Sequence, residues 1–247
     1  MQGACALLVW GSAAAWASAA AINYGNVATP KFDFLAIAES SGTDALPLYG
    51  APTGFDSGID FDPTTFIASS SAGVSDLTDG QLNFTISGKP TGSGGVWGFT
   101  SLSITESGNY SLTGSGTSAT AVYGGASMFV TVREIDGVAV TPFTLDVNSS
   151  LSRNLVANPG AGQPWNVVLF LDLGPSLPAN AAVTKAEVVV DNSLVAISQS
   201  QSSASIAKTD FGLSIPTPVN TGEIPEPLSG ALAGIATCGL LAARRRR

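Results

Sequence analysis

The stretch QLNFTIS, residues 81–87, decides the fold class, because apolar and polar side chains alternate along it without a break. A period of two places Leu82, Phe84 and Ile86 on one face of a β-strand and the polar residues on the other face. Such a strand covers a hydrophobic core with one face and meets solvent with the other. The stretch therefore predicts an antiparallel, all-β protein.

The same alternation recurs further along the chain. Residues 128–133 alternate in this way, and Asp136-Gly137 follows them as a typical two-residue hairpin turn. Residues 165–173 place Trp165 on one apolar face, while Val168 and Phe170 make the other face apolar as well. A strand that is apolar on both faces is usually buried on both, so we expect this strand to be central in its sheet.

Turn-forming residues separate the remaining strands. The strand that contains Val190 runs into Asp191-Asn192, which we interpret as a turn, and a last strand is expected near residues 211–215. Residues 69–80 and 111–120 are rich in Ser, Gly and Thr and are interpreted as long loops.

Strands of this kind, with no alternation of strands and helices, predict one domain over residues 22–216. The predicted fold is an antiparallel β-sandwich of jelly-roll type.

The composition is typical of an exported β-protein. Of the 247 residues, 45% are hydrophobic and only 11% are charged. Four of the 10 basic residues close the chain, so six remain in the rest of the chain against 18 acidic residues. An acidic body repels phosphate backbones, which argues against a nucleic-acid partner. Cys5 and Cys238 both lie near the ends, so the body has neither a disulfide nor a thiolate metal site.

The N-terminus carries a candidate signal peptide over residues 1–19. Residues 6–17 form an apolar run, and Ala17-Ser18-Ala19 follows as the small-x-small pattern that signal peptidase accepts. The segment before the run departs from the usual pattern, because it has no Lys or Arg. A buried N-terminal helix is the alternative, although no polar face makes the run amphipathic.

The C-terminal segment, residues 224–247, has three parts. Its motif Pro225, Glu226 and Pro227 is followed by the uncharged residues 228–243 and then by Arg244, Arg245, Arg246 and Arg247. As a helix, the uncharged part reaches about 24 Å, which nearly spans the hydrocarbon core of a membrane. The arginines prefer the cytoplasmic side, so the body faces outward. The prolines keep the preceding segment extended and open to a protease, and residues 217–223 form a spacer.

This tail resembles the PEP-CTERM sorting signal of Gram-negative bacteria, which has the same three parts in the same order. The resemblance covers only residues 224–247. It implies that the protease-transpeptidase exosortase recognises the tail, cuts near the motif and passes the protein to the cell surface. It also implies a bacterium that makes exopolysaccharide and biofilm matrix. An ordinary membrane anchor without a sorting step is the alternative.

Motifs of common enzyme classes are absent from the sequence. The chain contains no His, which excludes Ser-His-Asp and Cys-His catalysis. No phosphate-binding loop, dinucleotide fingerprint or nucleophile elbow occurs. Paired carboxylates could hydrolyse glycosides, yet Glu106, Glu134 and Glu187 have no sequence context that pairs them. We therefore predict no catalytic site and no required cofactor.

One acidic segment is a candidate cation site. Asp56, Asp60 and Asp62 lie close together in the sequence, and carboxylate oxygens are ligands that Ca²⁺ prefers. Their spacing does not match an EF-hand loop, and Asp is also a common turn residue. Plain turns are therefore the favoured interpretation.

Four aromatic residues are candidates for stacking on sugar rings: Trp97, Tyr110, Tyr123 and Trp165. Trp165 is in phase with an apolar strand face, which assigns it to the core. Trp97 follows a Gly-rich loop, and core packing is the favoured interpretation for it too.

Two functions remain open. The first is a non-enzymatic surface or matrix protein that signal peptidase and exosortase process, with the C-terminal helix as a transient membrane anchor. The second is a carbohydrate-binding, or less favourably carbohydrate-cleaving, exoprotein delivered by the same tail, with exopolysaccharide as its partner. Aromatic side chains across one exposed sheet face would favour the second function.

Overall fold

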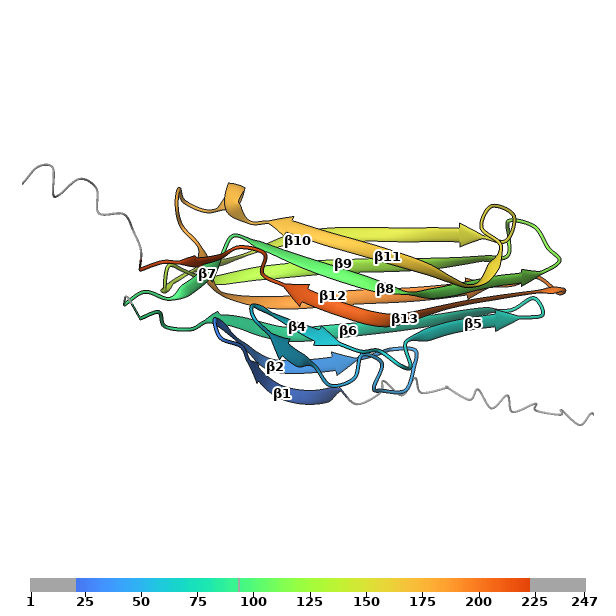
Figure 1. Ribbon diagram of the computed structural model, residues 1–247, viewed down its shortest axis with the longest axis horizontal. Helices are drawn as coiled ribbons and strands as arrows, with labels where there is room; N and C mark the ends of the chain where they lie inside the picture. The colour runs from blue at the N-terminus through green and yellow to red at the C-terminus, as the bar shows by residue number, and fades with distance from the viewer. Residues whose placement is uncertain (1–20, 93, 223–247) are drawn as a thin grey trace, which may run out of the picture.

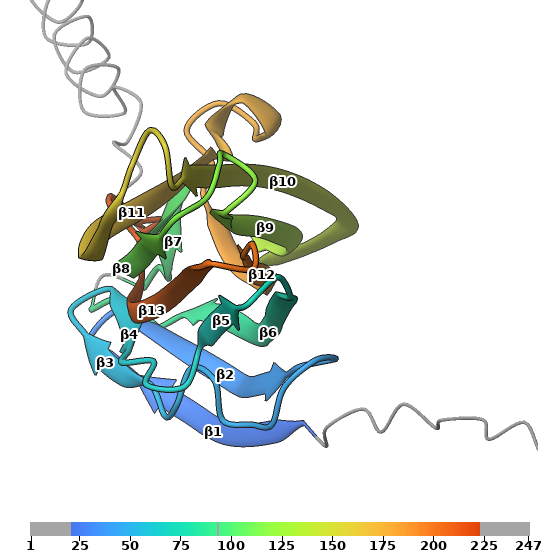
Figure 2. The same ribbon diagram turned by 90° about the vertical axis from the view of Figure 1, so that its right-hand side faces the viewer.

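The computed structural model describes residues 21–92 and 94–222, which are almost entirely β-structure. All strand pairs among these residues are antiparallel. The strands form two sheets that stack as a sandwich. Figure 1 shows the sandwich with its long axis horizontal, and Figure 2 shows it from one end. The predicted antiparallel β-sandwich is confirmed at this level, and the jelly-roll type of connection stays a prediction.

Sheet A has eight strands. Its main strands, in the order in which they lie side by side, are β1 (Ile22–Ala28), β2 (Phe32–Ser40), β6 (Ser75–Gly88), β12 (Val183–Ile197), β9 (Ala121–Ile135) and β10 (Val138–Asn154). The short strands β7 (Trp97–Phe99) and β14 (Pro218–Asn220) pair with each other beside the beginning of β12.

Sheet B has six strands. In spatial order they are β11 (Gly160–Asp172), β8 (Ser101–Gly114), β13 (Ser202–Ser214), β4 (Gly58–Phe61) and β3 (Thr53–Phe55), while β5 (Ile67–Ser71) also pairs with β13. One turn of 3₁₀-helix follows β11 at Gly174–Ser176. Within the described ranges, no helix is both long enough and apolar enough to cross a membrane.

The core lies between the two sheets and is built by the alternation that the sequence shows. Leu82, Phe84 and Ile86 of β6 all point inward and are almost completely buried, as predicted. Trp165 of β11 is also buried, and its indole N–H donates to the main-chain oxygen of Ala207. The inward faces of both sheets thus close one hydrophobic core.

The predicted hairpin at Asp136-Gly137 is confirmed. It joins β9 to β10, and both residues have positive φ angles of 48° and 78°. Two successive residues in this left-handed region are what a tight hairpin turn needs, and Asp and Gly tolerate it well.

Three predictions about where strands lie in the chain and in the sheets were wrong, in whole or in part. Most of residues 69–80, and residues 111–114, lie in strands, where most of their Ser and Thr side chains occupy outward positions of β5, β6 and β8. Residues 115–120 lie outside the strands, as predicted. Asp191-Asn192 is not a turn but the middle of β12. The strand that contains Trp165 is at the edge of sheet B, so Val168 and Phe170 are exposed rather than buried.

Two edge strands, β10 of sheet A and β11 of sheet B, each contain a proline and a register shift. Pro142 lies in the irregular part of β10, between the pairs that Ala139 and Phe143 make with β9. Pro164 follows a similar irregularity near the beginning of β11. Proline is tolerated in edge strands and bulges because it has no N–H to donate to a ladder.

The two terminal predictions fall outside the described residues. This applies to the signal peptide, residues 1–19, and to the sorting tail, residues 224–247. The sheet does extend into the segment assigned to the spacer, because Pro218 in β14 pairs with Phe99 in β7.

Candidate functional site

A groove of about 640 Å³ crosses the outer face of sheet A. Its volume lies within the range of small-molecule binding sites in proteins. Side chains from β2, β6, β9, β10 and β12 line it, together with the loop that follows β2. The lining residues are Ser40, Ser41, Gly42, Asp79, Gly80, Gln81, Gly125, Ala126, Ser127, Asn148, Ser149, Ser150, Asp191, Asn192 and Ser193.

The strand register aligns these residues in rows across the sheet. One row, read through neighbouring Cα partners, is Asn148, Ser127, Asp191, Gln81 and Ser40. Strands lie about 4.8 Å apart, so this row of five strands extends over about 19 Å.

A second row next to the first is Ser150, Gly125, Ser193 and Asp79. Small side chains fill the middle of this row, which leaves the groove hollow. At Gly125, an added Cβ would lie 3.1 Å from the hydroxyl oxygen of Ser193. The hollow therefore depends on residues as small as glycine and serine at these positions.

The polar groups of the groove offer both donors and acceptors. Gln81 donates from Nε2 to Asp191 at 2.6 Å and accepts at Oε1 from Asn83 at 2.9 Å, which fixes its orientation. Asn148 and Ser193, by contrast, make no side-chain hydrogen bond to any other residue in the described part of the chain, and they are open to a ligand.

Asp79 holds the loop at one end of the groove. Its Oδ1 accepts hydrogen bonds from the main-chain N–H of Gly42, the hydroxyl of Ser41, and both the main-chain N–H and the hydroxyl of Thr43. The donor–acceptor distances are 2.8–3.1 Å. Partial burial acts to raise the pKa of Asp79, but these hydrogen bonds outweigh it and lower the pKa below its ordinary value. Asp79 is therefore ionised at neutral pH and gives this end of the groove a negative charge.

Two exposed aromatic residues of β9 lie near the groove, although neither is among its lining residues. Tyr123 is 44% exposed and Phe129 is 37% exposed, and both project from the outer face of the sheet. The outward positions between them belong to Gly125 and Ser127. At about 3.3 Å for each residue, the two rings lie about 20 Å apart along the strand.

Of the four aromatic candidates from the sequence, only Tyr123 belongs to this face. Tyr110 and Trp165 are buried in the core. Trp97 is half-buried in β7 and packs against the core, with the Lys31 ammonium 5.4 Å from its ring centroid. Sequence reasoning missed Phe129 and the groove, because both depend on the pairing of strands that are distant in the sequence.

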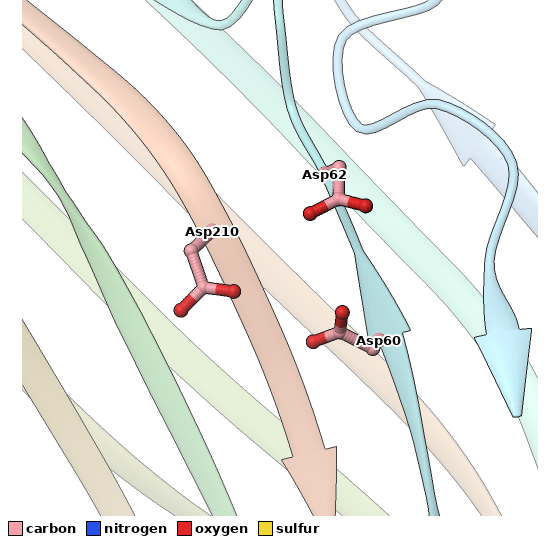
Figure 3. Close-up of side chains that lie close together, drawn as sticks. All are labelled: Asp60, Asp62 and Asp210. Atoms are coloured by element: carbon pink, nitrogen blue, oxygen red, sulfur yellow. The ribbon is translucent and has the colours of Figure 1, made fainter. Parts of the chain in front are cut away.

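The acidic segment is brought together only in part. Asp60 and Asp62 lie close to each other, and Asp210 of β13 joins them, so that carboxylate oxygens of all three lie within 4.8 Å of one another (Figure 3). Asp56 is elsewhere and pairs with Lys31 at 3.2 Å. Three carboxylates are hard oxygen ligands of the kind that Ca²⁺ takes.

Mutual repulsion makes this acidic cluster costly for the folded protein. Partial burial first, and then the carboxylates of Asp210 and Asp62, raise the pKa of Asp60 above its ordinary value. A raised carboxyl pKa favours folding below the unfolded pKa of about 3.9, and this contribution is lost as the pH rises through the folded pKa.

We therefore expect Asp60→Asn to raise the thermal midpoint by about 2 °C at pH 7, because it removes one of three repelling charges. The gain should disappear at pH 3, where the wild-type Asp60 carboxyl, with its raised pKa, is protonated. Melting curves at both pH values check this result. The matched variant Asp56→Asn, outside the cluster, should show no gain, and a lower midpoint for Asp60→Asn at pH 7 would contradict the repulsion argument.

The glutamates considered for glycoside hydrolysis do not face one another. Glu134 pairs with Lys185 and Glu187 pairs with Arg133, both at the surface. Glu106 is buried in the core.

No family model matches the chain, and no curated protein matches it either. Among solved structures, TmCBM61 in complex with β-1,4-galactotriose is 8% identical, with 63% of this chain and 68% of that chain covered at a TM-score of 0.19. The infectious bursal disease virus VP2 subviral particle is 12% identical, with 85% and 59% covered at a TM-score of 0.11. Likenesses this remote carry no argument, so the assignments above rest on strand pairing and on the groove.

Proposed function

We propose that the protein is an exported cell-surface protein whose groove on sheet A binds a neutral polysaccharide. The groove itself supports this proposal, because its lining is polar and two exposed aromatic side chains lie beyond it on the same face of β9, one in each direction along the strand. Delivery by the PEP-CTERM tail and processing by exosortase belong to the same proposal.

A sugar ring matches this combination of groups. Its hydroxyls both donate and accept hydrogen bonds, which suits the carboxylate of Asp191, the amide of Asn148 and the hydroxyl of Ser193. Its C–H face is apolar and packs on aromatic rings such as those of Tyr123 and Phe129. The length of the groove fits a chain of several sugar units better than a single sugar.

The charge of the groove favours a neutral glycan. Asp79 and Asp191 both line it, and neither Lys nor Arg is among the lining residues. The body as a whole is acidic. An anionic polysaccharide would meet repulsion both at long range and in the groove, whereas a neutral one would not.

We expect Tyr123→Ala and Phe129→Ala each to weaken binding of a neutral polysaccharide about tenfold, because each removes a stacking surface. Affinity electrophoresis in gels that contain single neutral polysaccharides, chosen by a glycan-array screen of the wild type, measures this change. Both side chains are half-exposed, so the variants should remain folded, and circular dichroism verifies that they do.

Two variants serve as matched controls. Phe170→Ala removes an even more exposed aromatic ring from the other sheet and should leave binding unchanged. Ser127→Leu fills the groove and should abolish binding, whereas Thr131→Leu on the same face of β9, outside the groove, should not. If the wild type binds no glycan, or if Phe170→Ala weakens binding as much as Tyr123→Ala does, the groove is not a sugar site and the matrix role without a glycan is favoured.

A further inference from the structure

A polar cluster lies at the centre of the sandwich, where the two sheets face each other. Lys208 of β13 is fully buried, and its Nζ lies 2.9 Å from Oε2 of Glu106 in β8. The same Nζ is in direct contact with Oδ1 of Asn192 in β12. An amine, a carboxyl group and a carboxamide from three strands and both sheets therefore meet inside the core.

Lys208 points inward because it continues the alternation of β13, in which Ala204 and Ile206 also face the core. A register shift between Lys208 and Asp210 interrupts the pairing of β13 with β8. With one residue added, both Lys208 and Phe211 face the core, although they are three positions apart. The added residue therefore keeps Phe211 on the same face as the lysine.

Aromatic rings enclose the lysine and exclude water from it. Its Nζ lies 4.7 Å from the ring centroid of Phe66, 5.3 Å from that of Tyr49 and 5.5 Å from that of Phe211. Burial lowers the pKa of the Lys208 ammonium, although the Glu106 carboxylate acts in the opposite direction. A lowered pKa enlarges the neutral fraction of the buried amine, and a neutral amine is a nucleophile.

The carboxamide of Asn192 is held and polarised at the same time. The hydroxyl of Tyr49 donates to its Oδ1 at 2.6 Å, and its Nδ2 donates to the main-chain oxygen of Asp191 at 3.2 Å. Burial, followed by the Glu106 carboxylate, holds the pKa of Tyr49 well above its ordinary value, so the hydroxyl stays a donor. A donor at this oxygen stabilises the negative charge that develops there when a nucleophile attacks the carbonyl carbon.

Glu106 has an atom that the folded structure does not use. While Oε2 pairs with Lys208, Oε1 is buried without a hydrogen-bond partner among the described residues. A buried polar atom without a partner is costly and rare. A carboxyl group that touches the amine and keeps one oxygen free can accept a proton on one atom and release it from the other.

We propose that Lys208 and Asn192 form an amide bond between their side chains, with Glu106 as the proton carrier and Tyr49 as the donor to the carbonyl oxygen. The lone pair of Nζ forms a bond to Cγ of Asn192, and the carbonyl π electrons move to Oδ1. As the carbonyl re-forms, the bond from Cγ to Nδ2 breaks. The Glu106 carboxylate takes a proton from Nζ and passes it to Nδ2, which leaves as ammonia. Amine and carboxamide become amide and ammonia, without an oxidant or a cofactor.

Peptide mass spectrometry of the full chain detects the bond directly. The full chain, purified after folding and then denatured, is digested with trypsin, which cannot cleave after an acylated lysine. We expect no cleavage after Lys208 and a peptide that begins at Ala186, continues past Lys208 and is lighter than its sequence by one ammonia, about 17 Da. Fragment ions from breaks between residues 192 and 208 should be missing, because the new bond closes this segment into a ring.

Two variants test the assigned roles. Glu106→Gln should give normal cleavage after Lys208 and the unmodified mass, while Glu134→Gln, which removes the partner of a surface lysine, should still lose the ammonia. If the wild-type digest contains residues 186–208 as a peptide of unmodified mass, the proposal is overturned and the cluster is an ion pair only. If Glu106→Gln forms the bond as completely as the wild type, Glu106 is not the proton carrier. Neither outcome bears on glycan binding, which is measured separately.

Discussion

Replacing Glu106 with alanine is expected to lower the free energy of unfolding by about 3–5 kcal/mol, because it leaves the buried Lys208 without a partner. Both side chains of this pair are almost completely inaccessible to solvent. A loss of this size is a large part of the stability of an ordinary domain, so the variant should unfold at a much lower urea concentration or fail to fold.

The size of this loss is judged against a surface pair and a double variant. Glu134→Ala breaks the exposed pair with Lys185 and should cost less than about 1 kcal/mol. Glu106→Leu combined with Lys208→Met buries no unpaired charge and should recover most of the loss, with any remaining deficit due to the missing cross-link. Equal losses in Glu106→Ala and Glu134→Ala would show that the pair does not carry the stability assigned to it.

Changing Pro225, Glu226 and Pro227 to alanine is expected to trap the protein in the membrane fraction. The motif lies beyond the β-sandwich, so the body should fold normally, while the protease loses its extended recognition segment. Fractionation of cells into membrane, surface and medium, with detection of the body in each fraction, measures the change. Equal delivery of this variant and of the wild type to the surface would rule out the sorting proposal.

The arginine cluster gives a contrasting variant of the same tail. Replacement of Arg244, Arg245, Arg246 and Arg247 with serine removes the signal that keeps the C-terminal end on the cytoplasmic side. Part of the protein should then pass through the membrane without an anchor and appear in the medium. Loss from the surface without retention in the membrane would thus separate the role of the arginines from that of the motif.

Periodicity in the sequence predicted the sandwich, but it could not assign strands to the centre or the edge. The strand that contains Val168 and Phe170 has the pattern of a central strand and lies at an edge, where both side chains are exposed. Residues 111–114 resemble a loop in composition and yet continue β8. Serine and threonine suit both turns and the solvent face of a strand, so composition alone does not separate the two.

The candidate sites were harder to predict than the fold, because they depend on register between distant segments. Asp60 and Asp62 could be found together, whereas Asp210 joins them only through the pairing of β4 with β13. Asn192 has the composition of a turn residue, and only the packing of Tyr49 and Lys208 around it shows why an amide is buried there.

The prolines in the outer strands β10 and β11 have a consequence for crowding. A second molecule that approached either edge would find no N–H at Pro142 or Pro164, and the irregular register near each proline would interrupt a ladder at that end of the strand. The excess of acidic residues adds repulsion between copies. Proline and charge together therefore disfavour the addition of strands from other copies at the proline-containing ends of β10 and β11, even at high local concentration.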